Sequence, residues 1–198
     1  MAHAEYLVAT PTIGIRHLAE GDRAAWKDIR AASRALHQQW EPLPTPGIEP
    51  GSDDAFDLAL STSHQPDRER LGAFLLSSHE LVAQVGLSQI CRGPFNNVVM
   101  GYWGSTAHAG RGFVSAGVRA AVSYCFNSRP IGLGLHRVEA NVIPTNLASI
   151  RVVRRVGFRL EGFSPRYLQI AGSYQDHLRF ALTNDEWDVV SHAPLRRT

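Results

Sequence analysis

Gly101-Tyr-Trp-Gly-Ser-Thr-Ala-His-Ala-Gly110-Arg-Gly112-Phe-Val-Ser-Ala-Gly117 is the stretch of sequence that decides the fold. A strand here runs through a turn with two glycines directly into a helix, so the turn directs free backbone N–H groups and the positive end of the helix dipole at one point. Gly110 and Gly112 permit positive φ angles, and Arg111 adds a positive charge. The stretch therefore predicts a site for an anion such as a pyrophosphate. A glycine-rich turn without a ligand is the alternative.

The residues before this stretch predict strands of the same sheet. Residues 71–77, 81–90 and 97–104 are strand-like and are joined by short polar or Gly/Pro turns, which is typical of an antiparallel meander. Further upstream, residues 12–18 alternate like a strand, and Asp22 stands where a helix N-cap is expected. The apolar face of that helix is expected to comprise Trp26, Ile29, Leu36 and Trp40.

Prolines and glycines make residues 41–51 a loop, after which a second helix starts near Ser52. Because too little chain precedes this loop to fold alone, it is not a domain linker. A proline-rich loop of this length is also a candidate lid over a substrate.

The residues after the stretch predict a crossover and a closing hairpin. Apolar residues repeat at helical spacing over 114–125, and residues 137–142 form the next strand, so the chain makes a strand, helix, strand crossover. A helix over 146–156 ends at Gly157, which is a C-cap residue, and residues 158–182 form a hairpin. The sheet is therefore predicted to be mixed.

Composition limits the class of protein. The chain has 198 residues, of which 44% are apolar and 19% charged, which favours one domain over 1–198 with a core at about 12–190. It has no apolar run long enough to span a membrane, and Met1–Glu5 does not open a secretory signal, so a cytoplasmic location is expected. The spacing of Cys91 and Cys125 indicates neither a disulfide framework nor zinc, and no metal is expected.

Charge gives little reason to expect nucleic acid. Twenty Lys and Arg against eighteen Asp and Glu leave a net charge of +2. This balance of charges is too even to indicate a nucleic-acid partner, except where the protein contacts the ribosome. Residues 137–179 are locally basic, with seven arginines against three acids.

Further motifs follow the glycine turn in a fixed order. They are Leu135-His-Arg-Val-Glu-Ala140, Asn146-Leu-Ala-Ser149-Ile, Val156-Gly-Phe-Arg-Leu-Glu-Gly162 and Tyr167-Leu-Gln-Ile-Ala-Gly172-Ser-Tyr-Gln-Asp-His177. With these motifs, residues 86–187 resemble the GNAT superfamily of acetyl-CoA-dependent N-acetyltransferases, and within it the RimJ/RimL type, which acetylates N-terminal amines of ribosomal proteins. The closing run is closer to RimJ. Ala107 departs from the Gln or Arg that often begins the superfamily's loop.

The resemblance implies a GNAT fold, which is an α/β (α+β) fold. We expect a single domain with a mixed, mainly antiparallel twisted sheet flanked by helices, whose splayed central strands hold acetyl-CoA. For Asn146, N-capping of its own helix is the alternative to a contact with pantetheine, and both can hold together. The residues implied to bind acetyl-CoA are Tyr102, Trp103, Gly104, His108, Gly110, Arg111, Gly112, Phe113, Val114, Asn141, Asn146 and Ser149.

The resemblance also implies catalytic roles. The Ser149 hydroxyl is expected near the CoA sulfur, where it can protonate the leaving thiolate, and an ordinary first-turn serine is the alternative. Glu161 is the first candidate base, with a pKa raised by partial burial, against a salt bridge with Arg159 or Arg166. Glu139 is the second candidate base; alternatively it orients Arg137 or binds the substrate amine.

Two further sets of residues are implied. Arg151, Arg154 and Arg155 are candidates to meet the CoA 3′-phosphate, with a solvated helix face as the alternative. The residues expected at the acceptor entrance are Tyr102, Tyr167, Asp176 and His177.

Amine chemistry decides how strong a base is needed. An N-terminal amine of pKa about 7.8 is roughly 10–15% neutral at pH 7, whereas a lysine of pKa about 10.4 is neutral at about 0.04%. The difference corresponds to about 3.5 kcal/mol, so an enzyme for α-amines needs only a modest base.

Three functions follow as hypotheses. The first is transfer of acetyl from acetyl-CoA, as co-substrate, to the N-terminal amine of a protein beginning with alanine or another small residue, plausibly a ribosomal protein, by direct attack in a ternary complex. The second is the same chemistry on a small-molecule amine such as an amino sugar, aminoglycoside or polyamine. The third is a non-catalytic acyl-CoA-binding, ribosome-associated module. A monomer or a homodimer is expected.

Overall fold

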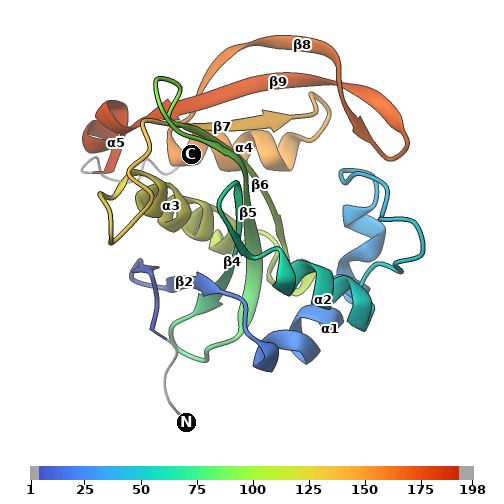
Figure 1. Cartoon of the computed structure of the whole chain (residues 1–198). Coiled ribbons are helices and arrows are strands. Elements are labelled where there is room, and N and C mark those ends of the chain that lie inside the picture. Colours follow the sequence, from blue (N-terminus) through green and yellow to red (C-terminus); the bar gives the residue numbers. More distant parts are fainter. Residues whose placement is uncertain (1–4, 192–198) are drawn as a thin grey trace.

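The computed structural model describes residues 5–191, and in this part of the chain one nine-stranded sheet carries helices on both faces (Figure 1). The strands are β1 (Val8–Ala9), β2 (Ile13–His17), β3 (His64–Gln65), β4 (Arg68–Leu75), β5 (Leu81–Cys91), β6 (Asn97–Gly104), β7 (Arg137–Val142), β8 (Arg159–Ile170) and β9 (Ser173–Thr183). The α-helices are α1 (Arg23–His37), α2 (Asp53–Ser61), α3 (Phe113–Phe126), α4 (Leu147–Val156) and α5 (Asn184–Ser191). Two short 3-10 helices, η1 (Glu20–Asp22) and η2 (Thr106–His108), complete the order.

The sheet is mixed, as predicted, and it opens at its centre. Its main path is β1-β2-β4-β5-β6-β7-β9-β8, with β3 attached to β4, and every neighbouring pair is antiparallel except β6 and β7. These two parallel strands pair at three positions, from Asn97–Arg137 to Val99–Glu139, and have no further partners beyond them. The expected splay of the central strands is therefore confirmed, and it lies between residues 100–104 and 140–142.

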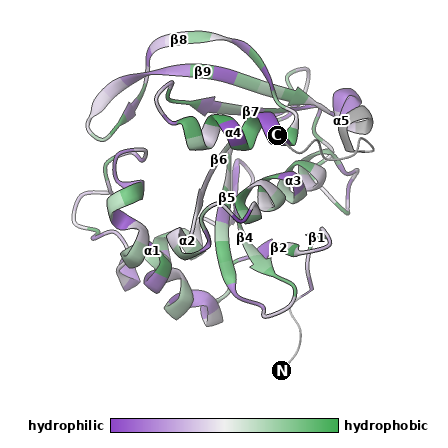
Figure 2. Cartoon of the chain, turned by 180° about the vertical axis from the view of Figure 1, so that it is seen from behind, coloured by the Kyte–Doolittle hydropathy of each residue, from purple (hydrophilic) through white to green (hydrophobic). Residues whose placement is uncertain are grey.

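Two apolar clusters cover the two faces of the sheet. On one face, α3 and α4 contribute Val118, Val122 and Val153 to a large core beneath the central strands. On the other face, Trp26 of α1 and Phe56 of α2 pack with Phe74 and Leu81. Apolar residues concentrate on the central strands, whereas the long β8–β9 hairpin is mixed in hydropathy (Figure 2). The sheet thus lies between two apolar clusters, and β6 and β7 part near its centre.

The predicted elements are confirmed along most of the chain. The meander is β4–β5–β6, the crossover is β6–α3–β7, and the closing hairpin is β8–β9. Ser52 caps α2 by accepting a hydrogen bond from Ala55 N–H, and Gly157 ends α4 with a φ of 112°. Cys125 is fully buried in the core, as expected from its place on the apolar helix face.

The predicted apolar face of α1 is partly wrong. Trp26 is buried, but Leu36 is 47% exposed and Trp40 lies beyond the end of the helix. The buried face instead continues through Ser33 and His37, seven and eleven residues after Trp26. Asp22 precedes α1 but forms no side-chain bond to it, because its carboxylate accepts hydrogen bonds from Arg16 and from Ala19 N–H.

The loop at 41–51 touches the tip of the β8–β9 hairpin. Ala171 N–H donates a 2.9 Å hydrogen bond to the Glu41 carbonyl, and a Cβ at Gly172 would lie 3.5 Å from Leu43. Arg30 of α1 fixes the start of this loop through two hydrogen bonds to the Glu41 carboxylate, of 2.6 and 2.7 Å. The loop is thus held between α1 and the hairpin.

Across the described residues, none of the helices has the length and hydropathy that a membrane crossing requires. Residues 1–4, on which the expectation of no secretory signal largely rests, lie outside the described part of the chain.

Candidate active site

A cleft of about 1000 Å³ lies on the α1–α2 face of the sheet. Its floor is made by β5 and β6, one wall by α1, α2 and the 41–51 loop, and the other by the end of β7, the start of α4 and the tip of the β8–β9 hairpin. The cleft reaches the opening between β6 and β7. Six of the residues predicted for the site line it: Tyr102, Trp103, Asn141, Asn146, Ser149 and His177.

Tyr102 and Ser149 form a hydroxyl pair at this opening. Tyr102 Oη lies 2.8 Å from Ser149 Oγ and 3.2 Å from the Ser149 carbonyl. Burial raises the pKa of Tyr102 to about 12, so the phenol keeps its proton at neutral pH. Asn146 fixes Ser149, because Asn146 Oδ1 accepts a 3.0 Å hydrogen bond from Ser149 N–H. The interpretation of Asn146 as an N-cap is therefore confirmed. Because Asn146 also lies in the cleft wall, a contact with pantetheine remains open to it.

The glycine turn after β6 has the geometry that an anion site requires. Gly110 and Gly112 have φ angles of +76° and +82°, and Gly112 is the N-cap of α3. The first backbone bond into this helix runs from Ala116 N–H to the Gly112 carbonyl, so the N–H groups ahead of Ala116 precede the helical ladder. We call residues 110–114 the anion turn.

Two arginines flank the anion turn. Arg111 extends over the Phe113 ring at 4.9 Å, and a Cβ built at Gly112 would lie 3.8 Å from Arg155 Nη1 of α4. Of the three arginines considered for phosphate, the structure thus brings Arg155 to the anion turn. His108 lies in η2 before the turn, with Nε2 3.5 Å from Glu80 Oε1.

Gly104 links the anion turn to the sheet. A Cβ at Gly104 would come within 2.3 Å of Val114 Cγ2, so only glycine lets the end of β6 approach the start of α3 this closely. The Gly104 carbonyl accepts a 3.0 Å hydrogen bond from His37 Nε2. The end of β6 is therefore fixed from both faces of the sheet.

Asn141 offers an unused hydrogen-bond acceptor in the cleft. It lies on β7 beyond the last pair with β6, and its Oδ1 atom is buried without a partner in the described structure. A buried acceptor of this kind calls for a ligand donor. The amides of a pantetheine chain supply such donors, so the opening and the anion turn together fit acetyl-CoA.

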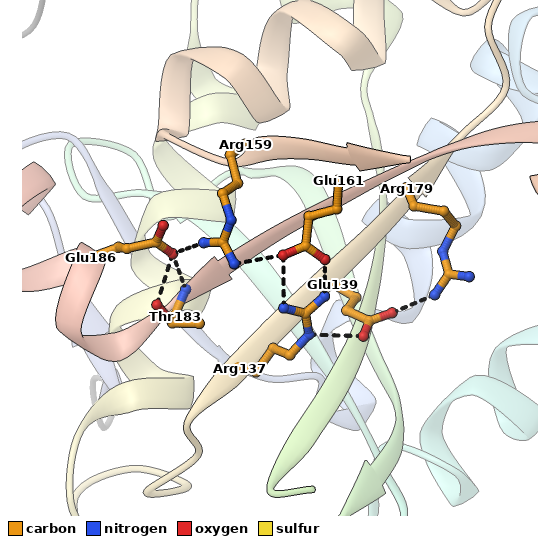
Figure 3. A network of polar contacts seen from close by, with 7 residues as sticks. All are labelled: Arg137, Glu139, Arg159, Glu161, Arg179, Thr183 and Glu186. Atoms are coloured by element: carbon orange, nitrogen blue, oxygen red, sulfur yellow. Dashed lines mark hydrogen bonds and ion pairs between the residues drawn. The ribbon is translucent and has the colours of Figure 1, made fainter. Parts of the chain in front are cut away.

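Glu161 and Glu139 do not lie in the cleft lining but in a network of ion pairs on β7, β8 and β9 (Figure 3). Glu161 pairs with Arg137 and with Arg159 Nη2, the latter at 2.5 Å. The Arg137 hydrogen bonds lower the pKa of Glu161, so the expectation that burial raises it is wrong. The salt bridge with Arg159, posed as the alternative, is present. Arg166 does not take part in it.

Glu139 is buried between two arginines. It accepts hydrogen bonds from Arg137 Nε at 2.9 Å and from Arg179 Nη2 at 2.7 Å. These contacts support the alternative in which Glu139 orients Arg137. Three of the seven arginines of the basic stretch are thus neutralised by carboxylates within the network.

His177 is the titratable side chain that the hairpin brings to the cleft. It is only 2% exposed, and its Nδ1 lies 2.9 Å from the Gln175 carbonyl. Since a carbonyl only accepts, Nδ1 carries the proton and Nε2 has a free lone pair. Burial lowers the pKa of His177, so the ring is neutral at pH 7.

The other two residues expected at the entrance have different places. Tyr167 meets His177 edge-on, with ring centroids 5.9 Å apart, and Arg179 covers the same tyrosine ring at 4.5 Å. Asp176 Oδ1 accepts a 2.8 Å hydrogen bond from Arg166 N–H. Arg166 has a positive φ within the irregular part of β8, so Asp176 holds a bulge there and is outside the cleft lining.

Sequence reasoning missed the contribution of α1 to the site. His37 lines the cleft and packs against Trp103 with the two rings tilted and their centroids 5.6 Å apart, and Trp103 in turn meets Trp26 at 6.5 Å. Ser33 Oγ accepts a 3.1 Å hydrogen bond from Thr106 N–H. The spacing of Trp26, Ser33 and His37 puts these three residues on one face of the helix and could have indicated which face is buried. It was not used because Ser33 and His37 are polar, and polar residues do not suggest burial.

Comparison with known proteins agrees with this geometry. A family model described as an acetyltransferase (GNAT) domain matches residues 12–159. The chain belongs to the GNAT acetyltransferase family. Within this family, the Bacillus subtilis protein named "probable N-acetyltransferase YjcK" is 38% identical over 115 residues, which span 58% of this chain and 61%, less than two thirds, of that relative.

Two further GNAT proteins match more of the chain. The Escherichia coli "[ribosomal protein uS5]-alanine N-acetyltransferase" is 29% identical over 170 residues, covering 84% of this chain and 86% of that protein. The structure described as Mycobacterium smegmatis RimJ in complex with CoA-disulfide superposes with a TM-score of 0.78 at 29% identity, covering 88% and 83% of the two chains. The family and the names of these relatives agree on an acetyl-CoA-dependent N-acetyltransferase.

Proposed function

We propose that this GNAT enzyme acetylates the N-terminal α-amine of a protein, plausibly a ribosomal protein that begins with alanine or another small residue. The E. coli relative that acts on alanine of uS5 supports this acceptor, as does the similarity to RimJ. Such an acceptor, together with acetyl-CoA, supports a cytoplasmic location for the reaction.

The observation that carries the proposal is the position of the opening between β6 and β7. The cleft reaches this opening from the α1–α2 face, while the anion turn begins α3 on the opposite face. Two substrates can therefore approach from opposite sides and meet at Tyr102 and Ser149. This arrangement favours direct attack in a ternary complex, since alignment of two bound reactants supplies much of the rate.

Several groups of this chain would hold acetyl-CoA, whose thioester supplies the acetyl group. The backbone N–H groups of the anion turn would bind the pyrophosphate, with Arg155 beside them. Asn141 Oδ1 and the unpaired edges of β6 and β7 would bind the pantetheine amides. Asn146 and Ser149 border the same opening.

Proton transfer is assigned to three side chains. His177 Nε2 accepts the proton of the attacking amine, because its lone pair is free and the ring is neutral at pH 7. A weak base suffices, since an α-amine of pKa about 7.8 is already partly neutral at pH 7. On the opposite side, Ser149 Oγ, 2.8 Å from Tyr102 Oη, would protonate the departing thiolate. His177 would then release the amine proton to solvent, and the Tyr102–Ser149 pair would regain one proton from solvent, so both ends return to their starting states.

The test measures CoA release by the purified protein with three acceptors. The first is a short peptide beginning with alanine; the second is the same peptide acetylated at its N-terminus and keeping an internal lysine; the third is spermidine. We expect turnover with the free N-terminus alone. Turnover with spermidine alone would replace the peptide acceptor by a small amine, while acetyl-CoA binding without any turnover would favour a non-catalytic module.

A further inference from the structure

Three side chains with metal-binding atoms converge at the ends of β2, β3 and β4. His17 Nε2 lies 3.0 Å from Glu69 Oε2, and His64 Nδ1 lies 3.8 Å from Glu69 Oε1. One ligand atom from each residue fits within 4.8 Å of the other two. Among the described residues, Glu69 forms ion pairs with these two histidines alone.

Strand pairing builds this cluster. His64 and Glu69 are directly opposite each other in the β3–β4 ladder, so their side chains project on the same face. His17 is opposite Leu71, which is two residues beyond Glu69 and therefore also on that face. Glu69 projects on the face of β4 opposite to Arg70, although both residues, with Arg68, border the cleft. His17 and His64 are not among the residues that line the cleft.

We propose that His17, His64 and Glu69 bind a divalent ion of the zinc class. Two imidazole nitrogens and one carboxylate oxygen suit Zn²⁺, Co²⁺ or Ni²⁺, and a three-residue set leaves a fourth position for water. In tetrahedral zinc sites the bonds are about 2.0–2.2 Å long, which places ligand atoms about 3.3–3.5 Å apart. The observed 3.0 and 3.8 Å separations bracket this value, so small side-chain rotations complete the site.

Burial and access are both suited to such a site. Glu69 is 5% exposed, which makes it the fixed ligand, whereas the His64 side chain is 74% exposed and free to rotate onto the ion. A pocket of about 360 Å³, bordered by His64, Glu69, Arg92 and Arg129, opens beside them. The arginines of this pocket favour a water molecule, or an anion such as hydroxide, as the fourth ligand.

The ion would act as a clamp on the fold. His64 follows the end of α2 by three residues, and β3 is only two residues long. A bound ion joins this short strand to β2 and β4, and so fixes the C-terminal end of α2, whose Ala55 and Leu58 line the cleft. No sequence motif indicates this site, because His17 is far from His64 and Glu69 in the chain and no cysteine is involved.

The experiment uses the full chain, without an affinity tag and freed of metal by chelation. Zn²⁺ is titrated by calorimetry, Co²⁺ by visible absorption, and thermal unfolding is recorded with and without Zn²⁺. We expect one Zn²⁺ per chain, a higher melting temperature with Zn²⁺, and a Co²⁺ spectrum typical of low coordination number. His64→Ala should weaken Zn²⁺ binding at least about tenfold and abolish the rise in melting temperature.

Two more variants make the result decisive. Glu69→Gln keeps the shape of the buried side chain and should also lose the ion. His136→Ala removes an exposed histidine 3.3 Å from Asn184 Oδ1 and should bind Zn²⁺ like the parent chain. Absence of micromolar binding by the parent, or equal binding by the His64→Ala and parent chains, would overturn the proposal. None of these measurements involves acetyl-CoA, so they do not depend on the proposed acetyl transfer.

Discussion

At the opening between β6 and β7, the protonation states of single side chains would set the direction of the proposed proton transfer. Tyr102 keeps its proton because burial raises its pKa to about 12, whereas burial lowers the pKa of His177 and leaves that ring neutral. The cleft therefore holds a donor pair on the CoA side and an acceptor on the hairpin side. This polarity matches a reaction that takes a proton from an amine and gives one to a thiolate.

Replacing His177 tests the acceptor. We expect His177→Gln to lower kcat by about 10²-fold or more with a small change in KM, because glutamine fills similar space but cannot take up a proton. Steady-state kinetics with the alanine peptide measures this loss. The acid limb of the kcat–pH profile should also differ between the His177→Gln variant and the parent. His136→Gln is the matched control, and a His177→Gln enzyme with nearly full kcat would contradict the assignment.

Glu161 provides the opposite prediction. Glu161→Gln removes the ion pairs with Arg137 and Arg159 at a partly exposed position, so we expect a loss of about 0.5–1 kcal/mol in the free energy of unfolding. Turnover should stay within about twofold of the parent, since a group outside the cleft takes no proton from the acceptor. Urea unfolding and kinetics on the same preparation check both. A large fall in kcat at unchanged stability would restore Glu161 as the base.

The surroundings of Glu161 could not be predicted from the sequence, because a bulge interrupts the strand that carries it. The β8–β9 register shifts between Leu160 and Gly162, so Glu161 is the extra residue and its facing cannot be counted from strand alternation. A second shift between Ser164 and Leu168 precedes the hairpin tip. His177 was expected at the acceptor entrance from the family resemblance, and it lines the cleft.

Among the elements, the turn from β6 to α3 was the most predictable. Gly110 and Gly112 were expected to permit positive φ angles, and both residues have positive φ angles. The order of strands and helices and the caps at Ser52 and Gly157 also followed from local patterns. The polar face of α1 did not, because burial of Ser33 and His37 depends on partners in β6 and η2 that lie about seventy residues away.

The anion turn should be sensitive to a single methyl group. Gly112→Ala introduces a side chain at a φ of +82°, which costs about 1–2 kcal/mol and distorts the N–H groups that face the ligand. We expect KM for acetyl-CoA to rise about 5- to 30-fold. Gly93→Ala is the control, because Gly93 has a φ of +73° with open space around it and lies at a distant turn. Equal effects of the two variants on KM would show that backbone strain alone, and not the anion site, is responsible.

For the whole molecule, buried histidines make stability depend on pH. Burial lowers the pKa of His37, whose ring donates to the Gly104 carbonyl and lies 3.2 Å from Arg30 Nη1. The pKa of His177 is lowered for the same reason. The unfolded chain therefore binds more protons than the folded chain just below the usual histidine pKa of 6.5, and the free energy of unfolding falls as the pH drops through that range.

Urea unfolding at about pH 7.5 and about pH 5.5 measures this dependence. We expect a loss of at most about 1.4 kcal/mol per pH unit for each of the two histidines, and a smaller loss in His37→Gln, which keeps a donor for Gly104. Carboxylates with lowered pKa, such as Glu161, act below their usual value of 4.5 and do not interfere. Identical pH dependence of the parent and the variant would refute the role of His37.

The contact between the 41–51 loop and the hairpin tip has a topological consequence. Elements of the chain enclose the cleft: β5 and β6 form its floor, α1 and the 41–51 loop form one wall, and β7 with the β8–β9 hairpin forms the other. The hydrogen bond between Glu41 and Ala171 joins the two walls. A free chain end enters such an enclosure as a single strand, whereas the middle of a polypeptide must enter it as a doubled loop, which needs more width. For the proposed N-terminal acceptor, this enclosure would favour chain ends by connectivity alone, before any side chain recognises the acceptor's sequence.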